Sequence, residues 1–290
     1  MRHGLIAVLS AAALLLCGCS QSTAEMTTPE TLPELTTEAE PSLVYYTEGH
    51  QTVPLSEVST FQAALEEKNC IVQCGGLEAL PSGADLVVLN SPREDITKAE
   101  AECLDRYMDD GGHFLLLFPA DDGKVRFKYL ERSLERYCIR PDYDRITETE
   151  SSRMQGGDPA FPEVQQVYVP SGMNIPASIR DGSVYLHECR SFHFETLENF
   201  HDLRLDAILE TADSAEGTPC GGVSDDPVSY RDERLMTMLF SRDTMHSNAF
   251  MICVGASDFL LDENYALPTS AGAQSYVLAA VDWAAHPNGF

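Results

Sequence analysis

In the stretch Asp85-Leu-Val-Val-Leu-Asn90, four apolar residues follow one another between two polar ends. An unbroken apolar run of this length is typical of a β-strand that is buried on both faces, as in parallel sheets covered by helices on both sides. The stretch His113-Phe-Leu-Leu-Leu-Phe118 has the same pattern further along the chain. Together the two runs predict an α/β fold built on a parallel sheet.

Helical patterns separate the predicted strands. Thr97-Lys-Ala-Glu100 is a capping box, in which the threonine hydroxyl accepts a hydrogen bond from the N3 amide and the glutamate reaches back to the threonine amide. We expect the helix that it opens to run to about Asp109 and to end at Gly111-Gly112. The first half then has the order β-α-β-β-α-β-α, which in one sheet implies parallel strands joined by right-handed crossovers. The predicted strands are 43–46, 69–73, 85–90 and 113–118, and the predicted helices are 55–68, 97–109 and 124–137.

The remainder has an irregular middle and an ordered end. Residues 139–230 are rich in Pro, Gly and Ser, which predicts short β elements and long loops, with an exposed loop over 211–231. We expect one α/β domain over residues 43–290, with a β- and loop-rich insertion at about 140–231. The short apolar pieces of the middle are 167–169, 184–186, 192–194 and 205–209; the end adds strands at 235–240 and 249–254 and a helix at 271–285.

The first 42 residues are expected to precede this domain as a leader and a tether. Residues 1–18 are typical of a signal peptide, because their apolar run is too short to span a bilayer comfortably. Leu16-Cys-Gly-Cys19 resembles a bacterial lipobox, which implies cleavage before Cys19 and diacylglycerol on its thiol; an ordinary secretory signal with a chance cysteine is the alternative. Residues 19–42, mostly Thr, Glu and Pro, predict an extended linker. The expected location is the extracytoplasmic face of the cell membrane, held by lipid.

The charge balance excludes one class of partner. The chain has 46 Asp and Glu against 19 Lys and Arg, a net charge of -27, which repels nucleic-acid phosphates. The densest basic run, Lys124–Arg136, is interleaved with glutamates and has the spacing of a solvated helix face. We therefore predict no nucleic-acid partner. The seven cysteines other than Cys17 and Cys19 lack the two close pairs of a zinc site, so no metal is predicted.

The order of these pieces resembles a known family. The 85–92 stretch, the 97–109 helix, the 111–119 stretch, Val254-Gly-Ala-Ser-Asp-Phe259 and Ala280-Val-Asp-Trp-Ala284 are similar to the GldG-type auxiliary domain of the ABC-type uncharacterised transport system family. The resemblance implies a flavodoxin-like (class I glutamine amidotransferase-like) mostly parallel sheet and association with an ABC permease and ATPase. Two departures stand out: many relatives begin with a transmembrane segment where this chain has the lipobox-like cysteine, and the family's Asn before Trp is Asp282 here.

No catalytic residue is predicted. In hydrolases of this type the nucleophile lies on a sharp strand-to-helix turn, but the corresponding turn Phe118-Pro-Ala-Asp-Asp-Gly123 has no Cys or Ser. Asp121 and Asp122 are interpreted as helix-start charges. His187, Cys189 and His193 would share one face of a single strand as a metal or Cys/His site, but the histidines are interpreted as ordinary residues of an acidic, loop-rich surface. No phosphate-binding or dinucleotide motif occurs, so no cofactor is expected.

A ligand or partner is expected at the carboxyl ends of the strands, where doubly wound sheets bind. The candidate binding residues there are Ser91, Pro92, Asp121, Ser257 and Asp258. The sequence predicts a non-catalytic, membrane-tethered auxiliary or binding component of an ABC-type transport system. Two alternatives stay open: a two-lobed solute-binding lipoprotein, which needs a twofold α/β repeat, and an amidotransferase-like hydrolase, which needs a Cys or Ser near a histidine.

Overall fold

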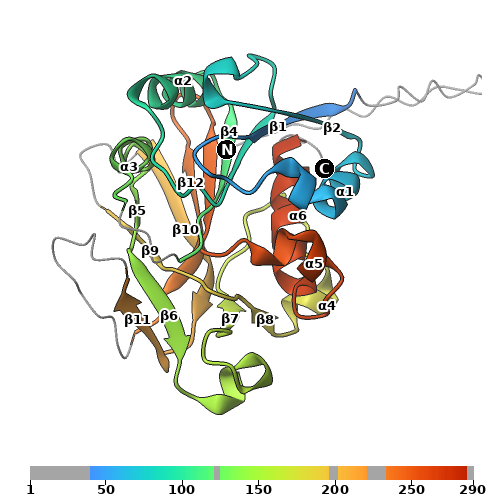
Figure 1. Cartoon of the computed structure of the whole chain (residues 1–290). Coiled ribbons are helices and arrows are strands. Elements are labelled where there is room, and N and C mark those ends of the chain that lie inside the picture. The colour runs from blue at the N-terminus through green and yellow to red at the C-terminus, as the bar shows by residue number, and fades with distance from the viewer. Residues whose placement is uncertain (1–39, 121–124, 196–201, 221–232, 286–290) are drawn as a thin grey trace, which may run out of the picture. The chain divides into compact units, whose positions relative to one another are not determined.

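The structure, a computed structural model, describes residues 40–120, 125–195, 202–220 and 233–285. Within these residues the chain forms an α/β body around an 11-stranded mixed sheet, with a separate two-stranded sheet beside it (Figure 1). The signal, lipidation and linker predictions for residues 1–39 lie outside the described residues.

One half of the main sheet is parallel, as the buried apolar runs predicted. Its strand order is β2-β1-β3-β4-β13, and every neighbouring pair in this group is parallel. All residues of β3, β4 and β13 are buried, which agrees with their uninterrupted apolar sequences. These strands are β1 (Ser42–Thr47), β2 (Cys70–Gly75), β3 (Leu86–Asn90), β4 (His113–Leu117) and β13 (Phe250–Val254).

The other half is antiparallel, so the prediction of a mostly parallel sheet holds for only part of it. The order continues from β13 through β12, β10 and β7 to β8, while β9 pairs with both β12 and β5. Most of these strands come from the region expected as an insertion, and they extend the main sheet. They are β5 (Ile139–Pro141), β7 (Glu163–Gln166), β8 (Val184–Tyr185), β9 (Phe192–Phe194), β10 (Leu203–Thr211) and β12 (Met236–Asp243).

The prediction of an exposed loop over 211–231 is wrong for the first part of that range. Ala215–Pro219 forms strand β11, which pairs antiparallel with β6 (Asp144–Glu148). The sequence Ala-Glu-Gly-Thr-Pro has no alternation of large apolar residues, although Ala215 is buried in the core together with Ile146 of β6. Residues 221–232 lie outside the described residues.

Helices cover both faces of the sheet and create two cores. Alternate strand residues point to opposite sides: Val88 packs in the core with α1 and α6, whereas Leu89 packs in the core with α2 and α3. Figure 1 shows α6 on one side of the sheet and α2 and α3 on the other. The helices are α1 (Ser59–Glu66), α2 (Lys98–Asp109), α3 (Lys128–Glu135), α4 (Ala177–Arg180), α5 (Asp262–Tyr265) and α6 (Ala271–Ala285), with 3₁₀ turns at Leu55–Glu57, Leu77–Ala79, Ser151–Arg153, Gln155–Gly157 and Asp258–Leu260.

Two helix starts illustrate what local sequence determines. The capping box of α2 is confirmed: Glu100 N donates to Thr97 Oγ1 at 3.2 Å, and Thr97 N donates to Glu100 Oε2 at 2.7 Å. Helix α3 begins later than expected, because the distant Asp95 carboxylate accepts hydrogen bonds from the amides of Tyr129 and Leu130. Among the described residues, no helix has the length and apolar character to cross a membrane.

Candidate functional site

A cavity of about 470 Å³ lies where three parallel strands end. The chain leaves β3 at Ser91, β4 near Pro119 and β13 just before Ser257, and all three residues line the cavity. The remaining wall comes from the loop after β1, the segment before β7, strand β8 with the segment after it, and the chain around α5. The lining residues are Val53, Ser91, Arg93, Pro119, Ala120, Phe161, Tyr185, His187, Glu188, Ser257, Asp258, Phe259, Leu261, Glu263, Asn264, Leu267, Thr269 and Ser270.

Ser91 adopts a backbone conformation that is uncommon for a residue other than glycine. Its φ is +53°, in the left-handed region, and it is only 2% exposed. Its amide donates to the carbonyl of Leu117 at 2.8 Å, which holds the end of β3 against the end of β4. The turn therefore fixes the serine side chain at the base of the cavity.

A chain of hydrogen bonds starts at Ser257, passes through the buried side chains of Asn90 and Tyr46, and ends at Val53, which also lines the cavity. The direction of the chain follows from this last bond. The carbonyl of Val53 can only accept, so Tyr46 Oη donates to it at 2.8 Å. Asn90 Nδ2 then donates to Tyr46 Oη at 3.0 Å, which leaves Asn90 Oδ1 to accept from Ser91 Oγ at 3.1 Å. Because the Ser91 proton is used in this way, Ser257 Oγ must donate to Ser91 Oγ, at 2.5 Å. The Ser91 proton is consequently directed at the buried side chain of Asn90, and the Ser257 proton at Ser91 Oγ.

A histidine–aspartate pair stands on another part of the wall. His187 Nδ1 lies 2.6 Å from Asp258 Oδ2, and the His187 ring stacks on Phe161 with ring centroids 4.3 Å apart. Burial raises the pKa of Asp258, although the hydrogen bond and charge of His187 act to lower it. The segment carrying His187 is attached to the strand ends on both sides, because Ala120 N donates to the carbonyl of Glu188 and Arg190 N donates to that of Gly255.

The structure brings together three of the five predicted binding residues. Ser91, Ser257 and Asp258 all line the cavity. Pro92 is buried next to Ser91 but is not part of the lining, and Asp121 lies outside the described residues.

Sequence reasoning missed the contribution of His187 and Phe161. The sequence around His187 predicts an ordinary surface histidine, because nothing in it indicates a contact with Asp258, 71 positions away. Among the described residues, no group of three or more His, Cys, Asp or Glu side chains could hold a metal ion.

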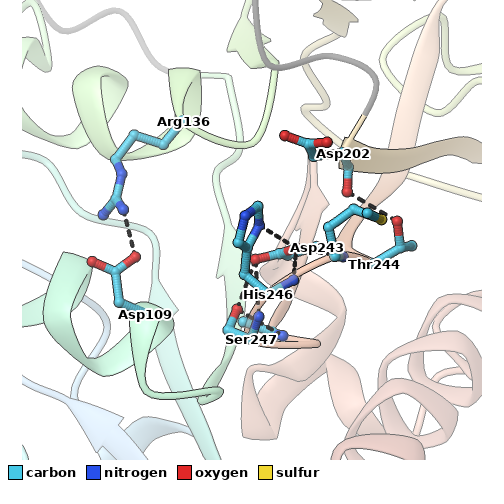
Figure 2. Close-up of polar contacts among 9 residues, drawn as sticks. Asp109, Arg136, Asp202, Asp243, Thr244, His246 and Ser247 are labelled. Carbon is cyan, nitrogen blue, oxygen red and sulfur yellow. Dashed lines mark hydrogen bonds and ion pairs between the residues drawn. The ribbon is translucent and has the colours of Figure 1, made fainter.

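A second depression, of about 440 Å³, lies at the opposite edge of the sheet, where β13 begins. Figure 2 shows its polar contacts: Arg136 with Asp109, and Asp243 with the turn residues His246 and Ser247. Asp243 accepts from three consecutive turn amides, and Arg136 joins the end of α3 to α2. These contacts explain Asp243 as the support of a turn and Asp109 as the support of a helix end.

Comparison with known proteins reveals the fold alone. No known protein-family model matches the chain, and no curated protein matches its sequence. Among solved structures, the mmIFT52 N-terminal domain is similar, with a TM-score of 0.59 and 15% identity over 84% of this chain and 97% of that domain.

Two other structures align at lower scores. A β-galactosidase from Rahnella sp. R3 has a TM-score of 0.46 and 11% identity. The alignment covers 83% of this chain but only 31% of the β-galactosidase. A cytoplasmic protein from Salmonella typhimurium has a TM-score of 0.44 and 10% identity over 82% of this chain and 97% of that one. At these identities the first likeness concerns the α/β architecture, and the other two carry no argument.

Proposed function

We propose that the chain is a membrane-tethered, extracytoplasmic auxiliary or binding component of an ABC-type transport system, and that it holds a small ligand without transforming it. The observation that carries the proposal is the cavity at the ends of the parallel strands, where Ser91, Ser257 and Asp258 converge. Binding residues at that edge are the usual arrangement in doubly wound sheets.

The strand order supports a finer description of the fold. The parallel order β2-β1-β3-β4-β13 corresponds to the flavodoxin-like order 2-1-3-4-5, in which ligands bind where the order reverses, between the first and third strands. One side of the cavity borders this point, since Val53 follows β1 and Ser91 follows β3, and the cavity extends from there past the ends of β4 and β13. We therefore propose a flavodoxin-like parallel half extended by antiparallel strands.

The directed hydrogen bonds favour binding over catalysis. A nucleophilic serine is activated by a hydrogen bond to a general base. Ser91 instead donates to the amide oxygen of Asn90, which is no base at neutral pH, and the chain of bonds ends on a backbone carbonyl. Both serine oxygens are thus held as hydrogen-bond acceptors.

A hydrolase is the second candidate, because of one specific observation. Ser91 combines a positive φ at a strand end with a cavity that also contains the His187–Asp258 pair. In that case His187 would take the Ser91 proton once the substrate displaced Asn90 as its acceptor. The two-lobed alternative is less favoured, since the described strands share one main sheet apart from β6 and β11.

Membrane flotation tests the tether. The full chain with its own leader is expected to float with lipid, whereas Cys19→Ala is expected to stay in the aqueous fraction. Cys17→Ala is the matched control and should float like the unchanged chain. A Cys19→Ala chain that still floats would overturn the lipid-anchor part of the proposal.

Two further measurements test the transport and binding parts. Co-expression with an ABC permease and ATPase encoded beside the gene should give a complex that survives detergent extraction; recovery of the chain alone contradicts the association. The unchanged chain and Ser91→Ala should hydrolyse simple ester and amide substrates at the same background rate. Turnover that disappears in Ser91→Ala would replace the binding function by the hydrolase.

A further inference from the structure

We infer that the cavity binds a small organic cation with N–H donors, such as a primary ammonium or guanidinium group. The inference deepens the proposed binding function and rests on it. It is drawn from three properties of the cavity wall: the direction of the serine protons, the balance of charged groups and the aromatic surface beside them.

The first property is an excess of acceptors at the base. The protons of Ser91 and Ser257 are both committed to the chain that ends at Val53, so only oxygen lone pairs remain for a ligand. Both serines are nearly buried, at 2% and 6% exposure, so a ligand that reaches them displaces the remaining water there. A ligand group that donates hydrogen bonds can therefore use the lone pairs that remain on the serine oxygens, whereas a group with only acceptors finds no free serine proton there.

The second property is the charge of the wall. Asp258, Glu188 and Glu263 line the cavity, against one guanidinium, that of Arg93. Arg93 has an interaction partner of its own, and Glu188 pairs with Arg145 at 3.1 Å. Glu263 is exposed and forms no hydrogen bond or ion pair with any described residue, so its carboxylate is available for a cation.

The third property is the aromatic part of the wall. Phe161, stacked on His187, and Tyr185 both line the cavity. The face of an aromatic ring attracts an ammonium or guanidinium group electrostatically. The net charge of -27 also raises the concentration of cations near the surface and disfavours anions.

Titration calorimetry on the full, detergent-solubilised chain tests the inference with five probes. Putrescine and arginine carry cationic N–H donors, choline is a cation without them, sorbitol is a neutral polyol, and inorganic phosphate is an anion. We expect putrescine or arginine to bind at one site per chain, choline at least tenfold more weakly, and sorbitol and phosphate without detectable heat.

Variants locate the bound cation. Glu263→Gln is exposed and should fold normally, and it should weaken amine binding about tenfold, as should Ser257→Ala. Glu102→Gln, an exposed glutamate on α2 that pairs with Lys98, is the matched control and should bind like the unchanged chain. Equal weakening by Glu102→Gln, or binding of many amines per chain, would indicate nonspecific attraction and overturn the inference.

The outcomes separate the ligand class from the binding function. Binding of sorbitol or phosphate that is lost in Ser257→Ala contradicts the inference that the ligand is a cation. It leaves the proposed binding function standing. Choline binding as tight as putrescine contradicts the N–H requirement. If none of the five probes binds, the cation inference fails, and the association with the permease still stands or falls by its own experiment.

Discussion

Ser91 Oγ lies 2.5 Å from Ser257 Oγ, although the two residues are 166 positions apart and follow different parallel strands. The contact spans β4, which lies between β3 and β13 in the sheet. It joins the strand ends at the base of the cavity and continues into the core through Asn90 and Tyr46. The integrity of this chain should therefore contribute to both stability and ligand binding.

Removal of the Tyr46 hydroxyl interrupts this chain of hydrogen bonds between Asn90 and Val53. In Tyr46→Phe, Asn90 Nδ2 and the Val53 carbonyl lose a buried partner, which should cost about 1–3 kcal/mol of unfolding free energy in urea denaturation. Tyr129→Phe, at a half-buried tyrosine whose hydroxyl has no hydrogen bond to a described residue, is the control and should change stability by less than about 0.5 kcal/mol. Equal losses of unfolding free energy in the two variants would contradict a stabilising role of this chain of hydrogen bonds.

Close packing at the end of β13 explains why position 255, in the stretch that resembles the GldG-type pattern, is a glycine. A Cβ atom at position 255 would lie 2.1 Å from the backbone carbonyl oxygen of Arg190, so Gly255→Ala must push apart β13 and the segment that carries His187. We expect a loss of about 1–3 kcal/mol, measured by thermal unfolding. At Gly83 an added Cβ has nothing within 4 Å, so Gly83→Ala should be nearly neutral. A Gly255→Ala chain as stable as Gly83→Ala would show that the close approach is absent.

The parallel half of the sheet could be predicted from the sequence because the apolar pattern that identifies each strand lies within that strand. The runs around Val87 and Leu115 are apolar throughout, which identifies strands buried on both faces. Ser91, Ser257 and Asp258 could be predicted as neighbours because each follows such a strand, and parallel strands end at the same edge.

The antiparallel half and the rest of the cavity depend on contacts between distant segments. His187 reaches Asp258 from a loop whose neighbouring strand, β8, has only two residues and thus no measurable periodicity. Strand β11 is recognisable only through its pairing with β6, because its own sequence contains Gly217 and Pro219. In such segments the tertiary partner determines the structure, and propensity does not.

Asp144 should make stability depend on pH near neutrality. It is 2% exposed, and burial raises its pKa to about 7, with the nearby Asp142 charge acting in the same direction against the hydrogen bonds from Ser191. A carboxyl whose folded pKa exceeds its unfolded value of about 3.9 contributes stability that is complete below that value and is lost as the pH rises through 7.

The matched substitution is Asp144→Asn, which imitates the protonated carboxyl. Its amide can donate to Ser191 Oγ, whose own proton reaches Asp142 Oδ2 at 3.0 Å. Urea denaturation between pH 5 and pH 8 should show the variant gaining stability relative to the unchanged chain as the pH rises, by on the order of a few kcal/mol. Asp213→Asn, at an exposed aspartate, should follow the unchanged chain. A constant difference across this range would mean that Asp144 is already ionised at pH 5.

Asp243 should govern stability in acid instead. Its carboxylate accepts hydrogen bonds from the amides of Met245, His246 and Ser247 and from the Ser247 hydroxyl in the turn between β12 and β13 (Figure 2). Burial acts to raise its pKa, but these hydrogen bonds outweigh it and lower the pKa to about 2. A depressed carboxyl pKa contributes stability that is present above about pH 4 and is lost as the pH falls toward 2.

Asp243→Ala removes the acceptor of all four hydrogen bonds and should cost about 1–3 kcal/mol at pH 7, because the turn amides lose their partner. Asp243→Asn keeps one acceptor oxygen and should lose less at pH 7, and its stability should fall less steeply between pH 5 and pH 3. Chemical denaturation at several pH values measures both effects, with Asp213→Asn again as the control. If Asp243→Asn and the unchanged chain lose stability in parallel below pH 5, the ionised carboxylate of Asp243 is not what holds this turn.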